Sequence, residues 1–388
     1  MTSSPLRPLI VLGTRPEAIK MAPLIRECLD RPSEFAPLIC STGQHREMLA
    51  QVLGYFQITP DIDLDLMRPG QTLTGLTADC LLAIDKTILE HRPDCLVVQG
   101  DTATVMSSAI VAFYHRLPIV HLEAGLRTGD LMAPWPEEFN RRVAGIVANL
   151  HCAPTVGAAD ALRREGVPEP NIRVTGNTVI DALLWTAERE RAATNQWTSL
   201  YPFAAEGSMV LITGHRRENF GSGLENMCLA LADLAVAFPE TAFVYPVHLN
   251  PQVKGPVHQR LGHLPNMHLV PPADYPGFVW LMDRSQVILT DSGGVQEEAP
   301  SLGKPVLVTR EKTERPEAVE AGLAELVGTD RERIVARVTH WLQQTDSADA
   351  GSQRSGTRAP SLSSPYGDGQ AAGRIADWML EAIQPTAR

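Results

Sequence analysis

Short apolar runs recur along the chain, and nearly all of them end in a glycine or a polar residue. In the first half of the chain these runs lie at residues 8–14, 36–43, 94–101 and 118–125. Uninterrupted apolar character over such lengths is typical of strands in a parallel sheet that is buried on both faces. Helix-like segments lie between the runs, at residues 16–30, 44–56 and 73–91. The pattern therefore predicts a doubly wound α/β half, in which helices cross over between parallel strands.

The same pattern begins again in the second half, after residues 171–185. Here the apolar runs lie at residues 209–215, 242–248, 267–272, 287–294 and 304–309. We predict a second α/β half, with the boundary near residue 170. Because ligands bind at the carboxyl ends of the strands in open α/β sheets, two such halves facing each other would hold a ligand in the cleft between them.

The end of the chain has a different composition. Residues 345–369 are rich in Ser, Gly, Ala and Pro, which predicts a flexible surface segment that is too polar to pack. A final helix is predicted at residues 370–383.

Composition and charge narrow the function classes. The chain has 388 residues, of which 44% are hydrophobic, and its formal net charge is -11. This net charge gives no support to binding of nucleic acid or of an acidic membrane surface, so any anion site must be a local cluster. The chain contains no run of about eighteen apolar residues, and its N-terminal apolar run is too short for a secretory signal. We therefore expect a cytoplasmic protein.

The six cysteines are scattered along the chain without a C-x-x-C pair. This arrangement favours neither a disulfide framework nor a cysteine zinc site. We expect reduced thiols in the core.

One strand end has the features of an anion site. In "TDSGGVQEE", Ser292, Gly293 and Gly294 open a predicted helix, whose free N–H groups and positive dipole end favour a phosphate. Glu298 lies about a turn inside this helix, where its carboxylate can accept hydrogen bonds from the hydroxyls of a ribose. The alternative is an ordinary glycine turn followed by acids of the first helical turn.

A second strand–turn–helix junction carries two cations. In "GTRPEAIKMAP", Arg15 and Lys20 lie near the start of a predicted helix, where they can meet a diphosphate. The alternative is that Lys20 is solvated and that Arg15 pairs with Glu17. No G-x-G-x-x-G or G-x-x-x-x-G-K-[ST] motif follows a predicted strand, which argues against a nicotinamide site and a P-loop.

Acids and histidines follow other strand ends. Asp101 lies in "QGDTATV", Glu123 in "HLEAGLRT", and Glu137 in "PWPEEFNRR". Carboxylates that converge on a cleft have pKa values that are pushed apart, which divides acid and base roles between them. Singly, each is equally explained as a helix cap or as a partner for Arg127, Arg141 or Arg142.

His215 in "GHRREN" and His248 in "YPVHLNP" follow predicted strands of the second half. A histidine there can act as an acid or as a cationic partner of a phosphate, or it can be a core histidine bonded to backbone. The "HLE" at His121 has the H-x-E spacing of zinc deaminases, but no P-C-x-x-C follows it, so we predict no metal site.

Together these motifs resemble the non-hydrolysing bacterial UDP-N-acetylglucosamine 2-epimerases along essentially the whole chain. The strings in the order of that family include "GTRPEAIKMAPL", "QHREML", "GDT", "HLEAGLRTGD", "PWPEE", "TGNTVIDALLW", "GHRRE", "YPVHLNP", "TDSGGVQEEAPSLGKPVLV", "TERPEAV" and "PYGDGQA". The resemblance implies a glycosyltransferase-B-type fold with two Rossmann-like domains. The first would comprise residues 1–170 and 366–388 and carry the catalytic acids, and the second, residues 171–365, would bind UDP.

The resemblance also implies the substrates, UDP-GlcNAc and UDP-ManNAc, and the residues that contact them. By position these are Arg15, Lys20, Asp101, Glu123, His215, Ala273, Phe278, Ser292, Gly293, Gly294, Glu298 and Arg315. Ser292 to Gly294 and Arg315 would take the diphosphate, Glu298 the ribose, and Phe278 would lie by the uracil. Ala273 departs from the family, because relatives often place a glutamine beside the base. The family further implies a homodimer and a second, regulatory UDP-GlcNAc near Gln44, Glu47, Gln71, Arg216 and His248.

The chemistry implied is loss of UDP from C1 and its re-addition, which inverts C2 and supplies precursors of surface polysaccharides. The C2 hydrogen has no adjacent carbonyl, so simple deprotonation is too costly. We expect Asp101, Glu123 and Glu137 to divide the acid, base and electrostatic roles, and His215 to assist the leaving phosphate. Because the electrons stay on the substrate, no metal and no other cofactor is expected.

Three alternatives stay open at the level of the sequence. A glycosyltransferase of the same fold would release UDP only with an acceptor. A hydrolysing relative would free ManNAc and UDP, and a sugar-nucleotide sensor would bind without turnover.

Overall fold

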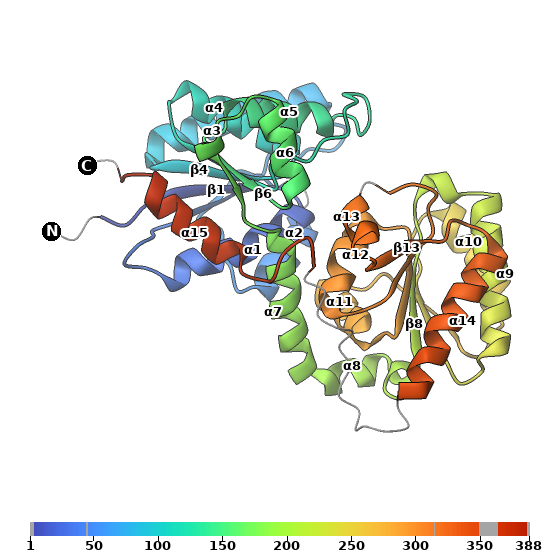
Figure 1. The fold of residues 1–388 in the computed structure, drawn as a ribbon. Coiled ribbons are helices and arrows are strands. Elements are labelled where there is room, and N and C mark those ends of the chain that lie inside the picture. The colour runs from blue at the N-terminus through green and yellow to red at the C-terminus, as the bar shows by residue number, and fades with distance from the viewer. Residues whose placement is uncertain (1–3, 44–45, 314, 349–363, 386–388) are drawn as a thin grey trace. The chain divides into compact units, whose positions relative to one another are not determined.

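The computed structural model describes residues 4–43, 46–313, 315–348 and 364–385. These residues form two compact units, of which the first comprises residues 1–182 and 366–388 and the second residues 183–365 (Figure 1). Each unit contains its own parallel sheet, covered by helices on both faces.

The first unit is built on a seven-stranded parallel sheet in the order β3-β2-β1-β4-β5-β6-β7. Its strands are β1 (Pro8–Leu12), β2 (Leu38–Ser41), β3 (Ile62–Asp63), β4 (Cys95–Gln99), β5 (Ile119–Leu122), β6 (Leu150–Ala153) and β7 (Ile172–Val174). Its helices are α1 (Arg15–Asp30), α2 (Arg46–Tyr55), α3 (Leu73–His91), α4 (Ala103–Tyr114), α5 (Glu137–Val147), α6 (Val156–Arg164), the start of α7 (Thr178–Ala192), and α15 (Ala371–Ala382). Figure 1 shows α3, α4 and α5 on one side of the sheet and α1 and α15 on the other.

The second unit has a six-stranded parallel sheet in the order β10-β9-β8-β11-β12-β13. Its strands are β8 (Met209–Thr213), β9 (Ala242–Pro246), β10 (Met267–Val270), β11 (Val287–Thr290), β12 (Val306–Val308) and β13 (Ala324–Leu326). Its helices include the rest of α7, α8 (Thr194–Leu200), α9 (Ser222–Ala237), α10 (Pro251–Leu261), α11 (Tyr275–Arg284), α12 (Gly293–Glu298), α13 (Pro316–Glu320) and α14 (Arg331–Ala348).

The predicted apolar runs correspond to β1, β2, β4 and β5 of the first sheet and to β8–β12 of the second, of which β10 is an edge strand, whereas the buried strand β6 was not predicted. Every residue of β1, β4, β5, β8 and β11 is buried, which accounts for their uninterrupted apolar character. The helices predicted at residues 16–30, 44–56, 73–91 and 370–383 correspond to α1, α2, α3 and α15. All six cysteines are buried and free. No helix among the described residues is long and apolar enough to cross a membrane.

The boundary between the units differs from the one predicted near residue 170. Strand β7 pairs with β6 through His151 and Ile172, which extends the first sheet. The N–H of Ala372 donates to Asp181 at 2.8 Å, so the start of α7 is also tied to the first unit. Residues 171–182 therefore belong to the first unit, because a short edge strand carries too little apolar sequence to be recognised beforehand.

The flexible segment predicted at residues 345–369 is wrong at both ends. Helix α14 continues to Ala348, and the carbonyl of Tyr366 accepts the N–H of Asn177 at 2.7 Å. Tyr366 is 2% exposed. Tyr366 is thus packed into the first unit, although the surrounding sequence is polar. Residues 349–363 lie outside the described part of the chain.

Candidate active site

The turn between β1 and α1 is fixed by a buried carboxylate. Thr14 caps α1, and Oε2 of Glu17 accepts the N–H groups of Gly13 and Thr14 at 2.9 and 2.7 Å. The hydroxyl of Thr102, which caps α4, donates to Glu17 at 2.7 Å. Burial raises the pKa of Glu17, and these hydrogen bonds oppose the rise. Glu17 is therefore committed to the backbone, and the predicted alternative of an Arg15–Glu17 pair is not formed.

Arg15 is the first residue of α1 and is half-buried. Its side chain makes no hydrogen bond or ion pair with another residue in the described part of the chain. This leaves the guanidinium available to an anion at the carboxyl end of β1.

Glu123, directly after β5, is the centre of a polar network in the first unit. Its carboxylate pairs with Lys20 at 2.5 Å, accepts the amide of Asn177 at 3.3 Å, and accepts the amide of Gln99. The backbone of Glu123 has φ 59°, in the left-handed region that few side chains occupy. The alternative of a solvated Lys20 is therefore wrong, whereas its contact with a diphosphate stays a prediction.

Gln99 and Asn177 were not singled out from the sequence. Gln99 ends β4, and Asn177 precedes α7 in the motif "TGNTV". Both residues lie at or soon after the end of a strand, which the sequence could have shown. Their shared partner, Glu123, could not be recognised from the sequence.

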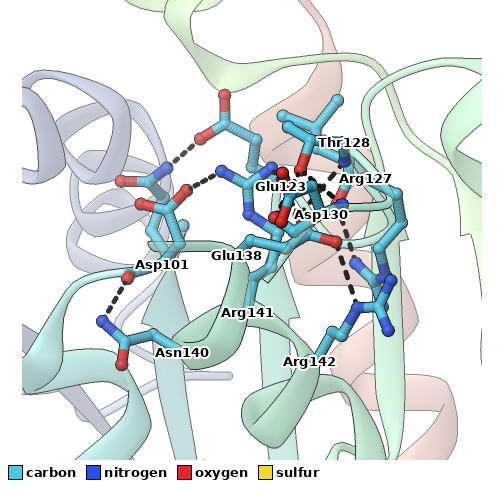
Figure 2. A network of polar contacts seen from close by, with 12 residues as sticks. Asp101, Glu123, Arg127, Thr128, Asp130, Glu138, Asn140, Arg141 and Arg142 are labelled. Atoms are coloured by element: carbon cyan, nitrogen blue, oxygen red, sulfur yellow. Dashed lines mark hydrogen bonds and ion pairs between the residues drawn. The ribbon is translucent and has the colours of Figure 1, made fainter. Parts of the chain in front are cut away.

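Asp101 follows Gly100, the first residue after β4, and its carboxylate interacts electrostatically with that of Glu123 (Figure 2). Its carboxylate is paired with Arg141 of α5, and its carbonyl accepts the amide of Asn140 at 2.9 Å. Burial raises the pKa of Asp101, Arg141 lowers it, and Glu123 raises it further. The structure thus brings together two of the three predicted acids.

Glu137 begins α5 and is half-buried, and no hydrogen bond or ion pair links its side chain to another described residue. Its neighbour Glu138 has a side chain that is 0% exposed. Glu138 pairs with Arg142 at 3.0 Å and accepts the N–H of Thr128 at 3.1 Å (Figure 2). The two adjacent acids therefore have different environments, which the motif "PWPEE" does not reveal.

In the second unit a buried aspartate shapes the turn after β8. Oδ2 of Asp291 accepts the N–H groups of His215 and Arg216 at 2.9 and 2.8 Å. The Nδ1 of His215 lies 3.4 Å from Oδ1 of the same carboxylate. Burial lowers the pKa of His215, and Asp291 opposes this. Burial therefore favours the neutral ring of His215, which has one N–H to donate.

His248 follows β9 and is exposed. Its ring stacks on that of His215, with 5.7 Å between the ring centroids, and its Nδ1 accepts the N–H of Asn250 at 3.1 Å. The alternative of a core histidine is therefore wrong for His248.

The predicted anion site after β11 is an ordered turn. The N–H of Ser292 donates to Thr290 at 2.9 Å, and Gly293 and Gly294 open α12. A methyl group on Gly294 would come within 3.4 Å of the Glu298 carboxylate, and one on Gly293 within 3.6 Å of Arg216. These glycines keep the approach to the first N–H groups of α12 open.

Arg315 is held beside α12. Its Nε pairs with Glu297, and its N–H donates to Thr313, whose hydroxyl donates to Gln296 at 2.6 Å. This chain of contacts fixes the guanidinium relative to the start of α12. Glu297, Thr313 and Gln296 were not predicted as site residues.

The remaining predicted residues lie on several elements. Phe278 is half-buried on α11, and Ala273 precedes Asp274, which caps that helix. Gln71 donates to Asp79 at 2.8 Å. Gln44 lies outside the described residues, as does the side chain of Glu47 on α2. The described residues contain no group of three or more His, Cys, Asp or Glu side chains that could hold a metal ion.

The chain is similar to known proteins along both of its units. A family model described as UDP-N-acetylglucosamine 2-epimerase matches residues 27–380. The chain belongs to this epimerase family. The UDP-N-acetylglucosamine 2-epimerase of Salmonella typhimurium is 51% identical over 374 residues, which are 95% of this chain and 97% of the relative.

Solved epimerase structures show the same architecture. The UDP-GlcNAc 2-epimerase from Neisseria meningitidis, bound to UDP-GlcNAc, is 42% identical over 97% of this chain and 100% of its own, with a TM-score of 0.85. The enzyme from Methanocaldococcus jannaschii, in complex with UDP-GlcNAc and UDP, is 30% identical over 97% of this chain and 100% of its own, with a TM-score of 0.76. The predicted class of two Rossmann-like domains of the glycosyltransferase-B type is thereby confirmed, as is the predicted epimerase family.

Proposed function

We propose that the protein interconverts UDP-GlcNAc and UDP-ManNAc by eliminating UDP and adding it back. The observation that carries this is the Asp101–Glu123 cluster at the ends of β4 and β5, in a chain that belongs to the epimerase family. Two carboxylates with cationic partners can handle a proton and positive charge at adjacent carbons.

The reaction balances without an external reagent. Breaking the C2–H bond leaves the proton on a carboxylate, and breaking the C1–O bond carries an electron pair away with UDP, so that a C1–C2 double bond remains. Addition of UDP to C1 and delivery of a proton to the opposite face of C2 give the epimer. Each step is reversible, which accounts for an equilibrium between the two sugars.

Each unit carries its own set of residues with a role in this proposal. Asp101, Glu123 and Glu137 act on C1 and C2, and Arg15 and Lys20 approach the diphosphate. The helix N-terminus at Ser292, Gly293 and Gly294 holds the departing UDP with Arg315 and His215, whose neutral ring donates its N–H. Glu298 accepts from the ribose, and Phe278 and Ala273 lie beside the base.

A second UDP-GlcNAc would bind as an activator near Gln44, Glu47, Gln71, Arg216 and His248. The stacked ring of His248 and the half-buried Arg216 support a polar surface of this kind. The measurement is the initial rate against UDP-GlcNAc. A hyperbolic curve, together with unaided turnover of UDP-ManNAc alone, would contradict the activator site.

We further propose that the protein works in the cytoplasm as a homodimer and supplies precursors of surface polysaccharides. Exposed apolar side chains support the dimer: Leu82, Leu89, Phe113, Tyr114, Phe139 and Ile146. They belong to α3, α4 and α5, which pack side by side. Large apolar side chains exposed on neighbouring helices are typical of an interface.

Product analysis tests the proposed reaction. Purified protein with UDP-GlcNAc should form UDP-ManNAc, and Asp101→Asn, Glu123→Gln and Glu137→Gln should each lower kcat by about 10²- to 10⁴-fold. Free ManNAc with UDP would indicate a hydrolase, and UDP release only with an acceptor would indicate a transferase. Normal turnover by all three variants would place the chemistry elsewhere.

A further inference from the structure

Arg141 joins two carboxylates of the first unit (Figure 2). Its guanidinium donates to Asp101, and its Nη1 lies 3.6 Å from the carboxylate of Glu138. The Arg141 side chain is 13% exposed, and that of Glu138 is 0% exposed. A planar guanidinium held between two carboxylates at this depth has a single orientation available to it.

Glu138 is itself fixed from two further directions. The N–H of Thr128 donates to it at 3.1 Å, and Nε of Arg142 donates to it at 3.0 Å. A buried carboxylate requires such partners, because an unpaired buried charge is costly. Arg142 and the Thr128 amide already stabilise the negative charge of Glu138. The positive charge of Arg141 is therefore not neutralised by Glu138 alone and can also stabilise the Asp101 carboxylate.

The groups around Asp101 leave Arg141 as its principal cation. The charged side chains that act on Asp101 are Arg141 from α5, Lys20 from α1 and Glu123 from the end of β5. Lys20 is engaged with Glu123 at 2.5 Å. Thr102, which follows Asp101, donates its hydroxyl to Glu17 of α1. Glu17 is an acid, so it adds no positive charge near Asp101.

Without Arg141 the environment of Asp101 would favour its protonated form. Burial raises the pKa of Asp101, and the nearby Glu123 carboxylate acts in the same direction. Arg141 is the largest influence that lowers it.

We propose that Arg141 is a positioning residue for the epimerisation proposed above: it orients the Asp101 carboxylate and keeps it ionised, while the buried Glu138 carboxylate holds the guanidinium. Asp101 then acts as a carboxylate, either as the base at C2 or as the stabiliser of positive charge at C1. The acid role falls to Glu123 or Glu137. The motifs alone do not show which carboxyl group acts as the acid, and this proposal excludes Asp101 from that role.

The test compares Arg141→Met with Arg142→Met over a range of pH. Both variants remove an arginine that pairs with Glu138, but Arg142 makes no contact with Asp101. A rate that needs the Asp101 carboxylate is present above the pKa of that group and is lost as the pH falls through it. Loss of Arg141 raises that pKa, so the acid limb of kcat should move to higher pH by about 1–2 units.

At pH 7 we expect kcat of Arg141→Met to fall at least about tenfold, with KM nearly unchanged. Arg142→Met should keep the wild-type acid limb. An acid limb of Arg141→Met that coincides with that of Arg142→Met overturns the proposal. So does a rise in KM with kcat unchanged, which would show that the Arg141 Nε, unpaired in the described structure, binds substrate directly.

If Arg141→Met does not fold, two conservative substitutions, Arg141→Lys and Arg142→Lys, provide the test instead. Arg141→Lys keeps the charge but loses the fork that reaches both carboxylates, so its acid limb should shift in the same direction by a smaller amount than that of Arg141→Met, while Arg142→Lys should show no shift. An unshifted limb in Arg141→Lys then overturns the proposal. Wild-type turnover of UDP-GlcNAc is measured first: its absence would refute the proposed function, whereas wild-type turnover with an unshifted limb refutes only the role of Arg141.

Discussion

At the scale of single residues, two adjacent glutamates at the start of α5 have different environments. Glu138 is fully buried among Arg141, Arg142 and the Thr128 amide, whereas Glu137 is half-buried without a described partner. The buried residue is committed to structure, and its neighbour is available to a substrate. The motif "PWPEE" gives both acids but not this difference, because their pairing depends on residues distant in the sequence.

Glutamine substitutions should separate the two roles. Glu138→Gln should lower the free energy of unfolding by about 1–3 kcal/mol, because two arginines lose their shared carboxylate. Glu137→Gln should leave stability within about 0.5 kcal/mol and lower kcat by about 10²- to 10⁴-fold. Urea denaturation and steady-state kinetics on both variants provide the comparison. An unstable Glu137→Gln, or a Glu138→Gln as stable as wild type, would reverse the assignment.

Some of the candidate site residues could be recognised from the sequence, and others could not. Asp101 and Glu123 were singled out from the sequence because they follow buried strands of the first sheet, and the turn at residues 292–294 because it follows a buried strand of the second. Gln99, Asn177 and Asp291 were not, because a hydrogen-bond partner across the fold leaves no local pattern. Arg141 was named only as one of three possible partners of the acids, and the structure pairs it with Asp101. The pairing of Lys20 with Glu123 was not predicted, for the same reason.

At the scale of elements, the loop after β5 depends on one glycine. Gly125 has φ +90°, and a methyl group there would lie 2.2 Å from the carbonyl oxygen of Ala158. This places α6 directly against the loop that carries Glu123. Gly129, in the same loop, has φ +83° and no atom within 4 Å of such a methyl group.

Alanine at these two glycines should have unequal effects. Gly129→Ala carries only the cost of the left-handed backbone, about 1–2 kcal/mol. Gly125→Ala adds a clash with backbone and should cost roughly 3 kcal/mol or more, with loss of turnover as Glu123 shifts. Thermal unfolding of both variants measures the difference. Equal destabilisation would contradict the close packing of α6 against this loop.

The C-terminal helix α15 is held by a buried acid, Asp181, which accepts the N–H of Ala372 at 2.8 Å. Burial raises the pKa of Asp181 to about 6. Because the folded pKa lies above the unfolded value of 3.8, its contribution to stability is fully present below about pH 4 and is lost as the pH rises through about 6.

Asp181→Asn should therefore remove part of the pH dependence of unfolding. Between pH 4 and pH 7 the wild type should lose up to about 3 kcal/mol relative to this variant, because Asn keeps an acceptor for Ala372 without a charge. Asp377→Asn, an exposed site on the same helix, is the control. Parallel stability profiles for Asp181→Asn and wild type would contradict the role of the buried carboxylate.

The hydrophobic pattern predicted some strands of the two sheets and missed others. Most of the central strands were predicted because they are buried on both faces, but β6, with the sequence LHCA, was missed because a histidine interrupts its short apolar run. Strands β3, β7 and β13 were not, because they have two or three residues each and contain charged positions. Tyr366 is buried and bonded to Asn177, although the composition around it predicts flexibility.

At the scale of the whole molecule, the proposed homodimer depends on the apolar face of α3, α4 and α5. Ile146→Asp places a charge on a side chain that is 81% exposed. Val236→Asp, on α9 of the second unit, does the same at a side chain that is 74% exposed. Sedimentation equilibrium should show Ile146→Asp as a monomer, or at least with about tenfold weaker association, and Val236→Asp as wild type. A monomeric wild type would contradict the dimer.

The central claim is that the C2–H bond breaks while UDP departs and returns. Proton NMR of the protein with UDP-GlcNAc in deuterated water, without added metal or nicotinamide, tests it most directly. The account predicts a UDP-ManNAc anomeric signal that grows to equilibrium, with deuterium at C2 of the product. UDP-ManNAc that retains its C2 proton, free ManNAc with UDP, or an unchanged spectrum would contradict it.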